Sequence, residues 1–183
     1  MTRITLTASL LLAAAALPSC GDAPAPAPSC EPSLTPTALI DNGAWITQSA
    51  DEDPFFDHRP ETIDCPEGAL TSEGGVLDLD TGRCNYVAIK QPLLIDVQPC
   101  DTVQAVLIHE ALFDVNPATA HVSILINGEI VFDQQIPIPS PSGLLTPRWQ
   151  LPAGARAGDE IVLHLHNHGV NTWNLLSVNT VAP

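Results

Sequence analysis

The sequence predicts an all-β domain folded as an antiparallel β-sandwich, and three observations lead to this fold class. Short runs of β-branched and aliphatic residues recur between turn residues along the chain. Helical periodicity is nearly absent from these runs. The connections are rich in proline, and no alternation of strands with helices is found, which argues against a parallel sheet.

Nine segments are expected to form the strands. The clearest local signal is Asn127-Gly128, which lies between two of these segments. Both turn residues can adopt positive φ, so a two-residue type I′ hairpin is expected there. In chain order, the expected strands are residues 44–47, 75–80, 85–90, 93–97, 103–110, 121–126, 129–133, 160–166 and 172–178.

Side-chain alternation predicts that five of the six histidines line one face of a sheet. In residues 161–168, three histidines occupy alternate positions after the aliphatic residues and therefore project from one side. An antiparallel pairing of residues 103–110 with 121–126, in the register that matches His109 with His121, adds two more to that side. Across the hairpin turn, Ile130 and Phe132 fall on the same face and cover part of it. The five histidines are His109, His121, His164, His166 and His168.

Residues 1–19 have the composition of a secretory signal peptide, with Arg3 before an apolar stretch. This stretch is shorter than the roughly 20 apolar residues that span a bilayer. The sequence Leu17-Pro18-Ser19-Cys20 resembles the lipobox of bacterial lipoproteins. The resemblance implies that Cys20 carries acyl chains such as palmitate and holds the protein in the bacterial cell envelope, at the outer membrane or cell surface. The alternative is an ordinary secretory signal that leaves Cys20 as a free thiol.

A change of composition predicts three parts in the chain. Residues 1–19 are the signal peptide, residues 20–37 are a tether rich in proline and alanine, and residues 38–183 form one β-sandwich domain. Alternating proline favours extended polyproline II, which cannot form a packed core. We therefore expect the domain to stand away from the membrane.

The charge of the chain argues against two kinds of partner. The formal net charge is −15, and removal of residues 1–19 would remove Arg3 and no carboxylate. Nucleic acid is not expected as a partner because lysine and arginine, which neutralise phosphates, are scarce. An acidic domain is also repelled by anionic lipids, so acyl chains are the expected membrane contact.

The cysteines agree with an exported protein. If Cys20 is acylated, four cysteines remain, an even number in a compartment where disulfides persist. Four cysteines allow three pairings. We favour Cys65 with Cys84, which closes a local excursion, and Cys30 with Cys100, which joins the N-terminal segment to the domain.

Two segments resemble those of the galactose-binding-like jelly rolls found in many extracellular carbohydrate-binding modules. They are Asp41-Asn42-Gly43-Ala44-Trp45 near the start of the domain and Gly169–Asn174 near its end. The resemblance implies that these segments lie side by side and that the domain binds a glycan. Trp45, Trp149 or Trp173 would then stack on a sugar, with Asn171 and Asn174 adding hydrogen bonds near Trp173. Core packing is the alternative for each tryptophan, and turn capping for Asn171.

The histidines suggest a second type of site. His164 and His166, at i and i+2 on a strand, project the same way and can bind one zinc or copper ion, with His109 or His121 as the third ligand. Hydrogen bonding within the sheet is the alternative role. Calcium is a further candidate cofactor, with ligands from two acidic groups, although a solvated acidic loop is the interpretation that we favour for both. These are Asp51, Glu52, Asp53 and Asp57 in one segment, and Asp78 and Asp80 in another.

No motif in the chain predicts catalysis. The Gly-x-Ser-x-Gly elbow and the phosphate-binding glycine loop are both missing from the sequence. We therefore expect a lipid-anchored binding module for a glycan or another envelope component. A metal-binding protein or metal-dependent enzyme is the first alternative, and a structural lipoprotein with a protein partner is the second.

Overall fold

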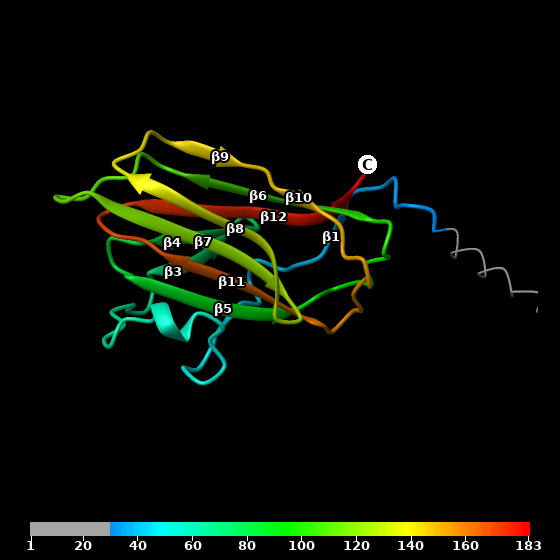
Figure 1. Cartoon of the computed structure of the whole chain (residues 1–183), viewed down its shortest axis with the longest axis horizontal. Helices are drawn as coiled ribbons and strands as arrows, with labels where there is room; N and C mark the ends of the chain where they lie inside the picture. The colour runs from blue at the N-terminus through cyan, green and yellow to red at the C-terminus, as the bar shows by residue number, and fades with distance from the viewer. Residues whose placement is uncertain (1–29) are drawn as a thin grey trace, which may run out of the picture.

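The computed structural model describes residues 30–183, which form two antiparallel sheets packed face to face (Figure 1). The structure is therefore an antiparallel β-sandwich, as predicted. The signal peptide, Cys20 and most of the tether lie outside the described residues. In the described part, no helix is both long and apolar enough to cross a membrane.

The first sheet has seven strands in the order β10-β6-β12-β4-β3, with β1 paired to β12 and β9 paired to β6. The second sheet has five strands in the order β2-β5-β11-β7-β8. The strands of the first are β1 (Thr37–Ala38), β3 (Leu70–Glu73), β4 (Val76–Asp80), β6 (Thr102–His109), β9 (Gly143–Leu145), β10 (Arg148–Trp149) and β12 (Thr172–Val181). Those of the second are β2 (Ile46–Thr47), β5 (Tyr86–Pro92), β7 (Ala118–Ile126), β8 (Glu129–Ile138) and β11 (Glu160–His166), and a short 3-10 helix, η1, spans Phe56–His58.

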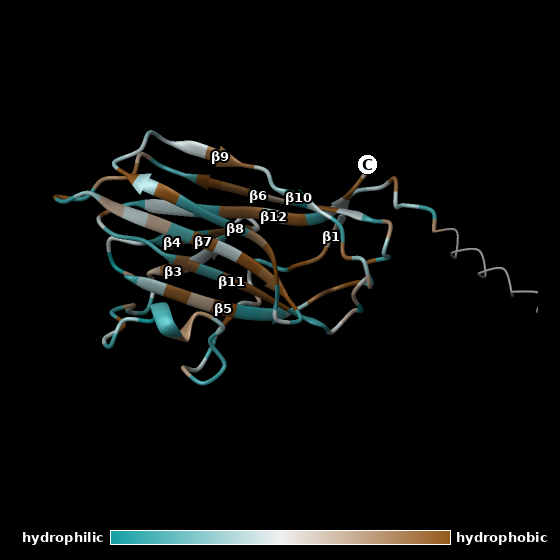
Figure 2. Cartoon of the chain, viewed as in Figure 1, coloured by the Kyte–Doolittle hydropathy of each residue, from teal (hydrophilic) through white to brown (hydrophobic). Residues whose placement is uncertain are grey.

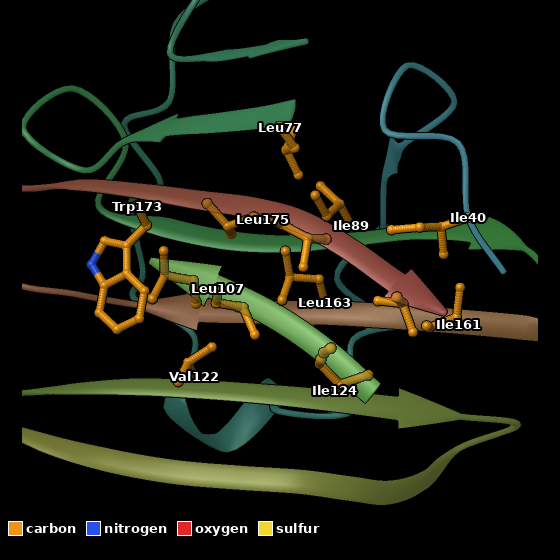
Figure 3. Packing of buried hydrophobic residues seen from close by; sticks show 14 of the residues in the cluster. Ile40, Leu77, Ile89, Leu107, Val122, Ile124, Ile161, Leu163, Trp173 and Leu175 are labelled. Atoms are coloured by element: carbon orange, nitrogen blue, oxygen red, sulfur yellow. The ribbon is translucent and has the colours of Figure 1, made fainter. Parts of the chain in front are cut away.

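The core lies between the two sheets and follows from alternation along the strands. On β11, Ile161, Leu163 and Leu165 are buried and belong to one hydrophobic cluster with residues of β6 and β12. Figure 3 shows side chains from both sheets meeting in this layer, with Trp173 at one end. In Figure 2, apolar stretches lie on β5, β6 and β12, while the loops are mainly hydrophilic. The predicted separation of the aliphatic residues Ile161, Leu163 and Leu165 from the histidines of this strand is thus confirmed.

The predicted hairpin at Asn127-Gly128 is present, with φ of 51° and 79° at the two residues. It joins β7 to β8, whose register shifts at a bulge between Ile124 and Leu125. The bulge corrects one expectation. Phe132 pairs with Ile124 and packs against the core, whereas Ile130 stays on the outer side and is 55% exposed.

Two further expectations about strands are wrong. His109 is not matched with His121, because β6 pairs with β12, β9 and β10, whereas β7 pairs with β8 and β11. Residues 93–97 are not a strand. They form a connection anchored by buried Leu93 and Val97, and only Val97 makes a bridge, to Ala155.

Two disulfides hold segments that have little regular structure. Cys30 is bonded to Cys100 and Cys65 to Cys84, the pairing favoured from the sequence. The first joins the start of the described chain to the loop before β6. The second fixes the loop before β3 to the start of β5, beside the groove described below.

We predict that Leu163→Ala lowers the free energy of unfolding by about 2–5 kcal/mol, because Leu163 is 1% exposed and its removal leaves a cavity between the sheets. Denaturant unfolding measures this change. Ile130→Ala on the exposed side of β8 is the matched control and should change stability by less than about 0.5 kcal/mol. Equal effects of the two substitutions would contradict the assigned core.

Candidate functional site

A buried amide at the start of the domain connects the two sheets. Asn42 is 6% exposed, and its Nδ2 donates to the carbonyl oxygens of Gly75 at 2.8 Å, Leu175 at 2.9 Å and Leu176 at 3.2 Å. The register of β12 shifts between Leu175 and Ser177, next to these carbonyls. Asn42 thus fixes the segment before β2 against β12 and the β3–β4 turn. The first segment singled out in the sequence therefore lies against the final strand β12, at Leu175 and Leu176, which directly follow the second segment.

Asn42 also orients Trp45. The indole Nε1 donates to Asn42 Oδ1 at 3.2 Å, and the half-buried ring packs against the core. The indole nitrogens of Trp149 and Trp173, by contrast, are buried and have no hydrogen-bond partner among the described residues. Trp45 is therefore held in one orientation by a specific hydrogen bond, at the edge of the sandwich.

Beside Trp45 a groove runs between the edge strands of the two sheets, β2 and β3. Its volume is about 320 Å³, which is in the range of small-molecule sites. Apolar groups form its floor, namely Leu70, Leu77, Ile89 and the Cys65 side of the disulfide. A second hollow shares Thr47, Cys65, Leu70 and Ile89 with it and extends to Arg59 and Tyr86. We call the two together the Trp45 groove.

Polar side chains line the Trp45 groove above this floor. Glu67, Thr71 and Ser72 are exposed and line the hollow that contains Trp45. The loop that carries Glu67 is fixed by Arg83, whose guanidinium donates to the carbonyl oxygens of Gly68 at 3.0 Å and Glu67 at 3.2 Å. An oriented aromatic ring, an apolar floor and free hydroxyl and carboxylate groups are the components of a sugar-binding site.

Arg59 forms the far wall of the groove and is held by a buried carboxylate. Asp53, whose side chain is 0% exposed, accepts hydrogen bonds from Arg59 and from the Tyr86 hydroxyl, each at 2.7 Å. Burial alone would raise the pKa of Asp53, but hydrogen bonds from Tyr86, Phe55 and Arg59 lower it. Burial and the bond to Asp53 raise the pKa of Tyr86. Asp53 is therefore an ionised structural group.

Histidines gather on the outer face of the five-stranded sheet. His164 and His166 project from β11, and His121 faces His166 across the β7–β11 pairing. Segment 48–60 covers part of this face and adds His58 and Phe55, whose ring stacks on His164 with centroids 4.2 Å apart. Figure 1 shows η1 of this segment below β5, on the side away from β6 and β12. His168 contacts His166 at 4.9 Å between ring centroids.

His164 lies at the centre of this face and is 0% exposed. Neither of its ring nitrogens has a hydrogen-bond partner among the described residues. Burial, followed by the neighbouring His121, lowers the pKa of His164 to about 3, and the carboxylate of Asp53 only partly opposes this. The imidazole is therefore neutral at physiological pH and acts as part of an aromatic stack.

Ser123, His121 and Asp133 lie together on the same face but do not form a catalytic triad. His121 Nε2 lies 2.6 Å from Asp133 Oδ1 and 3.0 Å from Ser123 Oγ, so one nitrogen faces both partners. Ser123 also donates to Asp133 directly. A triad needs the serine and the carboxylate on opposite ring nitrogens. The arrangement is a local hydrogen-bond cluster.

The proposed third metal ligand His109 is separated from the other histidines. It lies on β6 opposite Trp173 and points into the core, where its ring is 4.8 Å from the indole between centroids. His164 projects from the outer side of the other sheet, so His109 does not share a site with it. Of residues 30–183, no three or more His, Cys, Asp or Glu side chains are grouped to hold a metal ion.

The acidic residues considered for calcium do not converge. Asp53 points inward to Arg59, whereas Glu52 pairs with Lys90 at 3.0 Å and Asp51 and Asp57 are exposed. Asp78 and Asp80 share the outer face of β4, as expected. Burial, followed by the charges of Asp80 and Glu110, raises the pKa of Asp78. Among residues 30–183, no cationic side chain forms an ion pair with Asp78 or Asp80.

The residues expected to bind sugar around Trp173 have structural positions. Trp173 is 1% exposed and belongs to the core, so its ring is not accessible for stacking. Asn171 is 3% exposed and clamps the backbone of Phe113, accepting from its N–H at 2.7 Å and donating to its carbonyl at 3.4 Å. Asn174 is half-buried on the outer face of the seven-stranded sheet, opposite Asp78 and Ile108. These three residues form no common site.

Sequence reasoning missed the residues that complete the groove and its wall. Glu67, Thr71 and Ser72 lie in and around β3, a strand that the sequence did not predict. The buried charge on Asp53 gave no sequence signal because its partners Tyr86 and Arg59 come from different segments. One signal was available, since Trp45 belongs to the same segment as Asn42-Gly43, the segment that prompted the resemblance to carbohydrate-binding modules.

Comparison with solved structures finds β-sandwich domains of carbohydrate-binding modules. CBM27-1 of Caldicellulosiruptor saccharolyticus, in complex with mannohexaose, is 10% identical over 81% of this chain and 98% of that chain, with a TM-score of 0.45. A CBM4 structure is 13% identical over 80% and 94%, with a TM-score of 0.44. The N-terminal cellulose-binding domain of Cellulomonas fimi β-1,4-glucanase C is 15% identical over 66% and 88%, with a TM-score of 0.43.

No protein-family model matches the chain, and no curated protein matches it in sequence. At identities of 10–15% and TM-scores below 0.5, the likeness concerns the arrangement of strands and carries no argument about a ligand. The residues of the Trp45 groove are therefore what indicates a ligand site.

We predict that acid destabilises the domain through His164. The pKa of a histidine is ordinarily 6.5, whereas that of His164 is about 3 in the folded protein. As the pH falls below 6.5, the imidazole of His164 therefore takes up a proton only in the unfolded state. The free energy of unfolding should therefore decrease by about 2 kcal/mol between pH 7.5 and pH 5. Denaturant unfolding at both pH values, with His164→Phe as the variant and His168→Gln as the control, tests this. If the free energy of unfolding of His164→Phe decreased by the same amount between the two pH values, the acid sensitivity would not come from His164.

Proposed function

We propose that the protein is a non-catalytic, lipid-anchored binding module of the bacterial cell envelope and that it binds a glycan in the Trp45 groove. The observation that carries the proposal is the oriented, half-buried indole of Trp45 in a groove that also offers Glu67, Thr71 and Ser72. The apolar face of a pyranose packs on an indole, and its hydroxyl groups bond to hydroxyl and carboxylate side chains.

Preorganisation of the groove supports binding without large rearrangement. One wall is fixed by Asn42, the floor by the Cys65–Cys84 disulfide, and the far wall by the contact between Arg59 and Asp53. A site that is already ordered loses little conformational entropy when it takes up a ligand. The metal-binding alternative has no comparable support in residues 30–183, where no suitable group of side chains is found.

The proposed anchoring rests on the sequence before residue 30. The Leu17-Pro18-Ser19-Cys20 segment supports acylation at Cys20, and the following proline-rich residues support a tether. Export is consistent with two disulfides in the domain. Acylation at Cys20 would place the protein in the cell envelope, at the outer membrane or cell surface. Its partner there would be an envelope glycan or an envelope protein.

We predict that Trp45→Ala weakens retention on a glycan array by at least about tenfold, since loss of a central aromatic side chain costs 1–2 kcal/mol or more. Trp149→Ala is the matched control because Trp149 is also half-buried against the core but lies outside the groove. Thr71→Arg, at an exposed position, should block the groove without removing core packing. Unchanged retention in folded Trp45→Ala and Thr71→Arg proteins would refute the proposal.

We predict that Cys20→Ser abolishes incorporation of labelled palmitate and releases the protein from the membrane fraction. Cys20 is the residue that the lipobox would acylate, and the acidic domain offers no basic surface to hold anionic lipids. Ser19→Ala keeps a small residue before the cysteine and should still be labelled. Labelling that persists in Cys20→Ser would show that acylation occurs elsewhere.

A further inference from the structure

Negatively charged side chains that are not paired within residues 30–183 lie at the Trp45 groove. Glu67 lines the groove, is exposed and has no ion-pair partner among the described residues. Asp41 lies at the same edge, because a methyl group built on Gly43 would be 3.3 Å from Asp41 Oδ1 and 3.9 Å from Ser72 Oγ. The Asp41 carboxylate accepts a hydrogen bond from the Gly43 N–H at 2.8 Å and is otherwise exposed to solvent.

The positive charges near the groove are already engaged. Arg59 is paired with the buried carboxylate of Asp53 at 2.7 Å, and its guanidinium lies over the Tyr86 ring. Arg83 directs its guanidinium at the carbonyl oxygens of Glu67 and Gly68, so it serves to fix the loop. A ligand that entered the groove would therefore meet free carboxylates and no free cation from these two arginines.

The indole of Trp45 also favours a positively charged ligand group over a negatively charged one. The face of a tryptophan ring attracts cations through its quadrupole, and it does so more strongly than the ring of phenylalanine or tyrosine. An ammonium group near an indole and a carboxylate is thus favoured by two interactions. An anionic ligand such as a uronic acid polymer would be repelled by Glu67 and Asp41 and by the net charge of −15.

We infer that the Trp45 groove is selective for glycans that carry free amino groups, with Glu67 as the residue that determines this specificity. The inference rests on the proposed glycan-binding function and names the chemical class of its ligand. The sugar ring packs on Trp45 while the protonated amine pairs with Glu67, and Asp41 strengthens the negative potential at the groove edge. Sugars with an acetylated amine lose the charge and the ion pair.

The test compares two ligands that share one backbone, hexamers of β-1,4-linked glucosamine and of N-acetylglucosamine. Affinities are measured by calorimetry at a pH at which the amine is protonated. A partly exposed carboxylate–ammonium pair and an ammonium group beside an indole together correspond to roughly a three- to ten-fold gain in affinity for the glucosamine hexamer. This gain should be smaller in 0.5 M salt, because the Debye length is then only about 4 Å and the charges are screened.

Variants assign the preference to one side chain. In Glu67→Gln the preference for the glucosamine hexamer should fall to the part that the Trp45 indole contributes, whereas Glu73→Gln, at an exposed carboxylate on β3 outside the groove lining, should keep it in full. Both substitutions are at exposed positions, so folding is preserved, and thermal unfolding verifies this.

Three results would overturn the inference. They are equal affinity for the two hexamers, tighter binding of the acetylated one, and a preference that Glu67→Gln leaves intact. If a neutral glycan is retained in a Trp45-dependent way while the glucosamine hexamer shows no advantage, the groove remains a glycan site and only its selectivity is wrong. If no glycan is retained at all, the proposed function fails as well.

Discussion

The hydrogen bonds of one buried side chain, Asn42, determine how the edge of this sandwich is built. Its amide satisfies carbonyls at the β12 bulge and at the β3–β4 turn, while its oxygen receives the indole N–H of Trp45. Buried polar groups are costly unless they are paired, so the whole arrangement forms as a unit. The groove between the sheets and the orientation of its aromatic wall both depend on this amide.

A second buried polar group has the same role on the far side of the groove. Asp53 is ionised and fully buried, and it holds Arg59 and Tyr86 in place. Such a charge is tolerated only because three donors, including the Phe55 N–H, surround it. The segment that carries Asp53 also covers the histidine face through Phe55. His164 is therefore part of the packing beneath this segment, and the histidines of residues 30–183 are not grouped to hold a metal ion.

Local pattern predicted much of the fold. Alternation along residues 160–166 predicted that the aliphatic residues and the histidines of β11 lie on opposite sides, and Asn127-Gly128 predicted the β7–β8 hairpin. The pairing of β6 with β12 was not predictable, since strand order depends on contacts far apart in sequence. The bulge at Ile124 and Leu125, which returns Phe132 to the core, had no local signal either. Short edge strands such as β3 contain too few residues to show a period.

The candidate site was predicted less well because the role of each of its side chains depends on the residues that surround it in the folded structure. The sequence does not distinguish the three tryptophans, yet Trp173 is in the core and Trp45 lines a groove. What distinguishes Trp45 is the bond to Asn42, three residues earlier. The favoured disulfide pairing is the one observed, although the spacing of the four cysteines allowed three pairings.

The central claim is that the oriented indole of Trp45 is the surface on which the ligand rests. The three indole N–H resonances of ¹⁵N-labelled protein, followed by NMR during titration with the glucosamine hexamer, test this claim most directly. The account predicts a progressive shift of the Trp45 resonance, while those of Trp149 and Trp173 stay in place. Saturable binding that shifts Trp149 or Trp173 and leaves Trp45 unchanged would contradict it.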